Sequence, residues 1–230
     1  MTRTMPPASA RRGASAVRLT RATLALAVRE LTRRDAGLAR IVATHGPPPL
    51  WARPGGFRTL ARIILEQQVS LASAATLFAR IDAALPGGWT PRAVARAGAD
   101  GMRALGLTRQ KASFVVALAE HTAREPRWLE RLARDGDEAA HAALTARHGV
   151  GPWSASIYLL MVLRRADVWP PGDLALHKAI ARLPGQRGTP SSADATRFAE
   201  RWAPHRATAA RILWHGYLSD ARRDRGHRET

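Results

Sequence analysis

Cysteine is absent from the chain, which excludes disulfides, thiolate nucleophiles, zinc-finger folds and cysteine-ligated iron-sulfur clusters. Lysine is nearly absent, since Lys111 and Lys178 are the only two. No run of about 18 apolar residues occurs, so the sequence predicts no membrane span. The basic start of the chain lacks the apolar stretch of a secretory signal, and we therefore expect a cytoplasmic protein.

Acidic residues are the minority among the charged ones. Asp and Glu number 18 against 36 Lys and Arg, which gives a formal net charge of +18. Such a surface attracts polyanions, of which nucleic acid and an acidic membrane face are the usual ones. Because nearly all of the positive charge is arginine, the coding bias of a GC-rich genome is an alternative explanation. The charge therefore favours a nucleic-acid partner but does not choose between DNA and RNA.

With 230 residues, 46% of them hydrophobic, the chain is long enough for one large domain or for two small ones that share a cleft. Apolar residues recur at helical spacing and nothing alternates with period two for long, so we predict an all-α fold. Residues 1–19 hold four arginines and no acid, which predicts a disordered basic arm. Caps, prolines and glycines predict a first helix at about 20–44, with a break near 35–37. They predict further helices after 91, before 148 and from 152, and at about 57–66, 71–85, 108–121, 174–182, 193–202 and 206–220.

The most informative stretch covers residues 144–173, LTARHGVGPWSASIYLLMVLRRADVWPPGD. Gly149 and Gly151 interrupt a helical pattern because glycine accepts turn dihedrals that side chains disfavour, and Pro152 suits the first position of the next helix. The pattern predicts a helix-hairpin-helix. Unpaired N–H groups at a helix start favour phosphate, and here we expect them from Val150, Gly151, Trp153 and Ser154.

Asp173 ends this stretch on a loop that Pro170 and Pro171 stiffen. Aspartate is a favoured helix N-cap, so capping of the helix that follows is the simplest interpretation. The hairpin upstream favours a second interpretation, in which it holds a DNA backbone beside the carboxylate. The two roles can coexist.

The run GVGPWSA, followed 20 residues after Trp153 by Asp173, resembles the helix-hairpin-helix DNA glycosylases, and in particular the 3-methyladenine DNA glycosylase II family. The segments IILEQQVS and WAPHR match the same family, so the resemblance spans about residues 50–217. It implies two helical subdomains that flank a cleft, one of residues 20–55 with 165–225 and the other of residues 56–164.

The resemblance also implies a catalytic role for Asp173. Cleavage of an N-glycosidic bond builds positive charge on the sugar, which a carboxylate stabilises, and the carboxylate can orient the attacking water. Family members that nick DNA carry a Schiff-base lysine where this chain has Trp153, so we expect hydrolysis without strand cleavage. The resemblance allows a monovalent cation, Na⁺ or K⁺, on the carbonyls of His148 and Val150, and we expect no other cofactor.

Seven tryptophans supply candidates for a substrate pocket. An indole face attracts cations, and alkylated purines such as 3-methyladenine and 7-methylguanine carry a positive charge that normal bases lack. Trp153 and Trp169 adjoin the hairpin and the aspartate, and we assign them to the pocket together with Trp51. Because tryptophan in a helix is more often core than pocket, we assign Trp202 and Trp214 to the core.

Gln67 and Gln68 stand at a junction between two predicted helices. They are either exposed polar residues or a wedge that fills the gap left by a flipped base. The family motif puts Gln68 at the inserted position.

Together with these patterns, the family resemblance implies a monofunctional DNA glycosylase that removes alkylated purines from duplex DNA in base excision repair, and we expect it to act as a monomer. Two alternatives stay open. One is a glycosylase for uracil or hypoxanthine, and the other is a non-catalytic helix-hairpin-helix protein that senses lesions.

Overall fold

The computed structural model describes residues 17–226, except for the side chains of residues 222 and 224–226. This part of the chain forms helices joined by turns, with one isolated β-bridge, and confirms the all-α prediction. The elements are α1 Arg21–Arg34, α2 Ala36–His45, α3 Phe57–Leu65, α4 Leu71–Ala84, α5 Pro91–Ala104, α6 Arg109–Arg124, α7 Trp128–Arg131, α8 Asp137–Thr145, α9 Pro152–Tyr158, η1 Leu159–Leu163, α10 Leu174–Ala181, α11 Ser192–Ala199, η2 Glu200–Trp202 and α12 Arg206–Gly226. Within the described range, every helix is too short or too polar to cross a bilayer.

Several of the helices begin at capping residues that the sequence indicates. The predicted break between the first two lies at Asp35, whose side chain accepts a hydrogen bond from the N–H of Leu38 and caps α2. Such a bond satisfies a backbone donor that the helix itself leaves unpaired, so it fixes where the helix starts. The same bond, from the N–H three residues later, is made by Thr20, Ser70, Thr90, Thr108 and Asp173.

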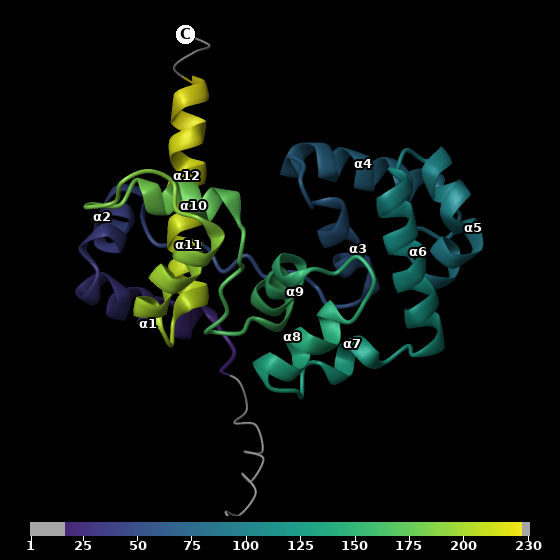
Figure 1. Cartoon of the computed structure of the whole chain (residues 1–230), viewed down its shortest axis with the longest axis horizontal. Coiled ribbons are helices and arrows are strands. Elements are labelled where there is room, and N and C mark those ends of the chain that lie inside the picture. Colours follow the sequence, from purple (N-terminus) through teal and green to yellow (C-terminus); the bar gives the residue numbers. More distant parts are fainter. Residues whose placement is uncertain (1–16, 227–230) are drawn as a thin grey trace, which may run out of the picture.

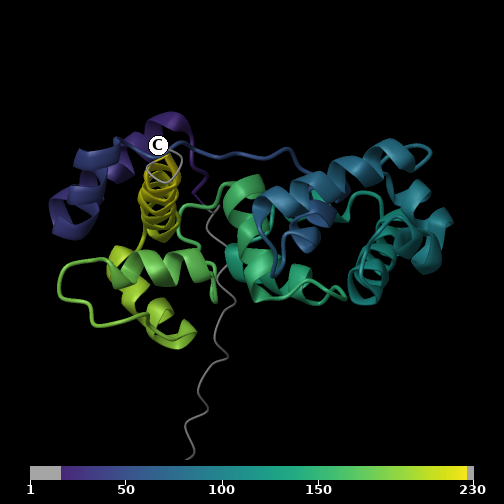
Figure 2. The same ribbon diagram turned by 90° about the horizontal axis from the view of Figure 1, so that it is seen from above.

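The helices gather in two groups, which Figures 1 and 2 show side by side. In one group α12 packs against α1, α2 and α10, and α11 lies against α10. The other group contains α3 to α9, where α3 packs against α6 and α9 and α5 packs against α6. The chain crosses between the groups twice, once between α2 and α3 and once after η1.

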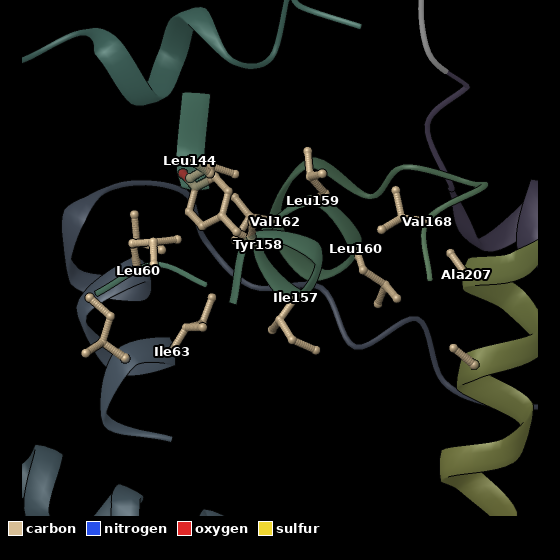
Figure 3. Packing of buried hydrophobic residues seen from close by; sticks show 14 of the residues in the cluster. Leu60, Ile63, Leu144, Ile157, Tyr158, Leu159, Leu160, Val162, Val168 and Ala207 are labelled. Atoms are coloured by element: carbon tan, nitrogen blue, oxygen red, sulfur yellow. The ribbon is translucent and has the colours of Figure 1, made fainter. Parts of the chain in front are cut away.

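One apolar core runs through both groups. Figure 3 shows Leu60 and Ile63 of α3 on one side of Ile157 and Leu160, and Ala207 of α12 on the other side. Each of these side chains is at most 4% exposed. The continuous helix α9–η1 is therefore a wall that the two groups share, and the division of the chain into two subdomains stays a prediction.

The start of the described chain corrects the predicted extent of the basic arm, 1–19. Residues 1–16 of this arm lie outside the described residues. Leu19 is only 1% exposed, and its N–H donates to the carbonyl of Arg164 at 2.6 Å. The carbonyl of Val17 accepts from the N–H of Ala166 at 3.0 Å. Backbone pairing and the burial of one leucine bring this end of the predicted arm into the fold.

Candidate active site

A cleft of about 1590 Å³ opens between the two groups of helices. The segment after α3, the turn between α8 and α9, and α9 itself line one side of it. The loop before α10, the first residue of α11, and α12 line the other side. Residues that are far apart in the sequence therefore meet in this cleft.

The turn between α8 and α9, called the hairpin from here on, comprises residues 146–151. Gly149 has a φ of +81°, and a Cβ there would lie 2.1 Å from Cγ of Phe114 in α6. Both the left-handed backbone and this close approach require glycine. Pro152 then occupies the first position of α9, which needs no backbone donor.

Gly151 differs from Gly149. Its φ of −80° is available to any residue, so the expectation that both glycines serve turn dihedrals is wrong for Gly151. A Cβ at this position would meet nothing within 4 Å. The missing side chain leaves open space in front of α9, on the surface that lines the cleft.

Three of the four amides predicted to face phosphate form no hydrogen bond within residues 17–226. They are those of Gly151, Trp153 and Ser154, at the start of α9, where a helix leaves its first donors unpaired. The fourth prediction is wrong, because the N–H of Val150 donates to the carbonyl of Arg147 at 3.0 Å and closes the turn. Val150 is 3% exposed and belongs to the core.

Asp173 is held by three N–H donors. Its Oδ1 accepts from the backbone N–H of Leu176 at 3.0 Å and from Nε1 of Trp214 at 3.1 Å. Its Oδ2 accepts from Nε1 of Trp153 at 2.9 Å. The residue is 9% exposed and lines the cleft beside Gly172. Asp173 therefore caps α10 and faces the cleft at the same time.

The hydrogen bonds that the Asp173 carboxylate already accepts determine how many of its acceptor sites remain free. An ionised carboxylate has about four acceptor sites, two on each oxygen. Two bonds occupy Oδ1 and one occupies Oδ2. The remaining site is thus on Oδ2 of Asp173, in an orientation that the two indoles and the helix start fix.

Two of the three predicted pocket tryptophans, Trp51 and Trp153, line the cleft. The prediction for Trp169 is wrong, because this residue does not line the cleft, is 7% exposed and packs against Trp202 with ring centroids 5.7 Å apart. The core assignment of Trp202 is confirmed by an exposure of 1%. The core assignment of Trp214 is confirmed by an exposure of 8%, but this residue also lines the cleft, and its hydrogen bond to the aspartate was not predicted.

The two glutamines have different positions. Gln67 is half-buried, and its Nε2 donates to the carbonyl of Gly149 at 2.9 Å and to Oγ of Ser154 at 2.8 Å. This engagement corrects its assignment to the wedge, because the side chain ties the segment after α3 to the hairpin. Gln68 is exposed, with a φ of +57°, and stands beside Val69, which is 46% exposed.

This arrangement of hairpin and aspartate agrees with a comparison of the whole sequence. The family model described as "HhH-GPD superfamily base excision DNA repair protein" matches residues 61–205, more than half of the chain. The chain belongs to the HhH-GPD superfamily.

Three relatives of this HhH-GPD protein are named as 3-methyladenine DNA glycosylases or glycosidases. The chain is 32% identical to DNA-3-methyladenine glycosylase 2 of Escherichia coli (strain K12) over 71% of its own length, and it spans only 61% of that relative. The structure of the Schizosaccharomyces pombe 3-methyladenine DNA glycosylase in complex with abasic DNA aligns with a TM-score of 0.73 and 25% identity, over 82% of this chain and 95% of that one. A DNA-3-methyladenine glycosidase from Bacillus halodurans aligns with a TM-score of 0.71 and 25% identity, over 85% and 91%.

Lys111 of this HhH-GPD protein binds the backbone of the segment that follows α3, which lines the cleft, and the sequence did not reveal this role. Its Nζ donates to the carbonyls of Leu65 and Gln67 at 2.7 and 2.9 Å, so it binds the end of α3 and the segment that reaches the hairpin. Burial lowers the pKa of Lys111. Lysine is scarce in the sequence, but nothing near Lys111 shows that its side chain reaches 44 residues back along the chain.

A monovalent cation at the HhH-GPD hairpin, which the family resemblance allows, would depend on backbone oxygens alone. Within the described residues, no group of three or more His, Cys, Asp or Glu side chains gathers around a common point. The carbonyls of His148 and Val150 accept no hydrogen bond from any described residue. Carbonyl oxygens suit hard cations, so these two residues would hold such an ion.

Proposed function

We propose that this HhH-GPD protein is a monofunctional DNA glycosylase that hydrolyses the N-glycosidic bond of alkylated purines, of the 3-methyladenine and 7-methylguanine type, in duplex DNA. The observation that carries the proposal is Asp173, a carboxylate that three N–H donors orient in a cleft beside the hairpin. The names of the relatives from Escherichia coli and Bacillus halodurans, and the DNA-bound Schizosaccharomyces pombe structure, support this substrate class.

In this proposal the hairpin binds the DNA backbone. The unpaired amides of Gly151, Trp153 and Ser154 donate to phosphate oxygens, and the helix dipole adds to the attraction. The open space at Gly151 admits a close approach of the backbone. Contacts of this kind carry no sequence information, which suits an enzyme that inspects any sequence.

Gln68 is the wedge in this proposal. A base must leave the helical stack to reach an enclosed site, and a side chain that enters the gap stabilises the flipped state. Gln68 is exposed and lies in the segment between α3 and α4, with a φ of +57°. The exposed apolar residues Val69 and Leu71, 46% and 57% exposed, follow it in the chain and would contact the neighbouring bases.

Asp173 stabilises the transition state of the proposed reaction. As the bond between C1′ and the base nitrogen breaks, its electron pair leaves with the base and positive charge develops on the sugar. A fixed carboxylate stabilises that charge more than it stabilises the ground state. A water bound at the remaining site of Oδ2 then adds to C1′ and gives its proton to the carboxylate or to solvent. The products are a free base and an abasic site.

The surfaces of the cleft favour alkylated purines over uracil or hypoxanthine. The indole N–H groups of Trp153 and Trp214 both donate to Asp173, which leaves their ring faces rather than their donors for a base. Ile157 and Met161 add apolar surface. Indole faces attract a cationic base, whereas discrimination of a neutral base depends on hydrogen bonds to its polar groups.

Hydrolysis without strand cleavage is supported by the positions of the two lysines. A lyase needs an amine that attacks C1′. Lys111 is engaged with two backbone carbonyls, and neither it nor Lys178 lines the cleft. Trp153, in the first turn of α9, occupies the position where the family resemblance places that amine.

The test measures bases released from methylated duplex DNA by the wild type, by Asp173→Asn and by Asp35→Asn. Asp35 is a matched control, because it caps α2 and accepts the indole N–H of Trp202 at 2.8 Å but does not line the cleft. We expect Asp173→Asn to lower the release rate by about 100-fold or more, and Asp35→Asn to release bases nearly as fast as the wild type.

Three results would contradict the proposal. Rapid release of bases by Asp173→Asn would show that the carboxylate has no catalytic role. A wild type that binds the duplex but frees no base would favour the non-catalytic sensor. Strand cleavage without added base or amine would exclude the monofunctional reaction.

A further inference from the structure

Arg211 of α12 is a buried cation whose hydrogen bonds within the described part of the chain all go to backbone carbonyls. Its exposure is 0%, and its guanidinium donates from Nε to Leu50 at 2.8 Å, from Nη1 to Ala207 at 2.9 Å and from Nη2 to Leu160 at 2.7 Å. Within the described residues, no carboxylate forms an ion pair with it. Burial lowers the pKa of Arg211 to about 10, so the group is still charged at neutral pH.

The three acceptors of Arg211 belong to different parts of the fold. Ala207 lies in α12 itself, and Leu50 lies in the segment that crosses between the two groups of helices. Leu160 lies in η1, near the end of the helix, where carbonyls lack a donor from a following turn. One planar guanidinium thus joins α12 to η1 and to the crossing segment.

Two of these contacts, Leu50 and Leu160, and Arg211 itself adjoin residues of the cleft. Leu50 precedes Trp51, Leu160 precedes Met161, and Trp214 follows Arg211 by one helical turn. Trp51, Met161 and Trp214 all line the cleft. Arg211 therefore connects three segments that each contribute a residue to the lining of the cleft: the crossing segment, η1 and α12.

We propose that Arg211 is a positioning residue for base excision: it fixes Trp51, Met161 and Trp214 relative to one another and, through Trp214, orients Asp173. This inference rests on the proposed glycosylase function. The fork of donors in arginine matches three separated carbonyls, whereas the ammonium of lysine is a single point of charge. A shift of about 1 Å at a reacting group can lower a rate by about 100-fold.

The test compares Arg211→Lys and Arg211→Met with Arg165→Lys. Arg165 is the control, because it is also a buried arginine, 5% exposed, that donates to the carbonyls of Leu132, Ala133 and Asp135 and does not line the cleft. It differs from Arg211 in its ion pair with Asp137, at 3.3 Å. Three quantities are measured: the single-turnover rate of base release from methylated duplex DNA, the Kd for a duplex with an abasic site, and the ¹H–¹⁵N signal of the Trp214 indole, assigned with Trp214→Phe.

We expect Arg211→Lys to fold, to shift the Trp214 indole signal and to lower the release rate by about 10- to 100-fold, with a change in Kd below about threefold. In a Trp214→Phe background the same substitution lowers the rate by a smaller factor, because the two residues act together. Arg165→Lys leaves the indole signal and the rate as in the wild type.

The proposal is overturned if Arg211→Lys keeps both the indole signal and the rate, if its loss of rate equals that of Arg165→Lys, or if neither Arg211 variant folds while Arg165→Lys does. If the wild type releases no base, the proposed function fails, yet the indole signal still decides whether Arg211 positions Trp214.

Discussion

Asp35 and Asp173 are held in the same way in two regions of the molecule. Each caps a helix by accepting a backbone N–H at 3.0 Å. Each also accepts an indole N–H, from Trp202 at 2.8 Å in one case and from Trp153 at 2.9 Å in the other. Only Asp173 accepts a second indole N–H, from Trp214, and lines the cleft. A capping carboxylate with an indole donor is thus a structural device, and the surface that it faces decides whether it can also react.

The same contrast appears in two other pairs. Gly149 is packed against Phe114, whereas Gly151 faces open space. Trp202 is enclosed in the core, whereas Trp214 lines the cleft. In each pair one member serves the fold, and the other leaves a face of the cleft free for a ligand.

The largest effect is expected at Gly149. Gly149→Ala places a methyl group against Phe114 in a backbone of positive φ, and both terms destabilise the folded state. Each term is worth about 1–3 kcal/mol, so we expect the free energy of unfolding to fall by about 3 kcal/mol or more. Urea denaturation followed by circular dichroism measures this loss.

Gly151→Ala is the variant to compare with Gly149→Ala. Its methyl group meets no protein atom, so the free energy of unfolding should change by less than about 0.5 kcal/mol. The same methyl group occupies the space proposed for a phosphate, and we expect the Kd for duplex DNA to rise about tenfold, which is about 1.4 kcal/mol. Equal Kd values for Gly151→Ala and the wild type would show that DNA does not approach the hairpin here.

Substitutions of Trp202 and Trp214 should have different effects, one on the free energy of unfolding and the other on the rate of base release. Trp202→Phe removes the indole partner of Asp35 and lowers the free energy of unfolding by about 1–3 kcal/mol, while the rate of base release per folded molecule stays unchanged. Trp214→Phe removes a donor from Asp173 and lowers that rate by about 10- to 100-fold. If both variants lose rate to the same extent, then the second indole of Asp173 has no special role.

The parts of the site that could be predicted from the sequence are those that local backbone rules decide. Pro152 indicates the first turn of α9, and Asp173 follows a glycine at a helix start, so the hairpin and the cap are both visible within about 30 residues. The unpaired amides of Gly151, Trp153 and Ser154 follow from the position of the helix start alone.

The parts that could not be predicted are contacts between side chains that are distant in the sequence. Trp169 and Trp214 are both buried indoles, and no periodicity shows that only the second reaches Asp173, across 41 residues. Gln67 looks like a wedge by its motif, yet its amide bonds to the hairpin 82 residues away. A tertiary partner decides the role of such a side chain, and the sequence around it does not identify that partner.

The smallest effect is expected for a partly exposed carboxylate that does not line the cleft. Asp82 forms a two-pronged ion pair with Arg58, at 2.6 and 2.7 Å, and both groups are partly exposed. The hydrogen bonds from Arg58 lower the pKa of Asp82 below its ordinary value of 3.8. The stabilisation is therefore fully present above that ordinary value and is lost as the pH falls through the lowered pKa of the folded state.

Asp82→Asn should accordingly lower Tm at pH 7, by an amount equivalent to less than about 1 kcal/mol because solvent screens the pair. The gap between the wild type and the variant should close as the pH falls below 3.8. Thermal melts at a series of pH values measure this gap. Asp100→Asn is the control, since Asp100 is 98% exposed and its pair with Arg103 is long, 3.4 Å, so its Tm should follow the wild type at every pH. A gap for Asp82→Asn that stays constant down to acid pH would mean that the aspartate acts through packing, and that the ion pair contributes nothing.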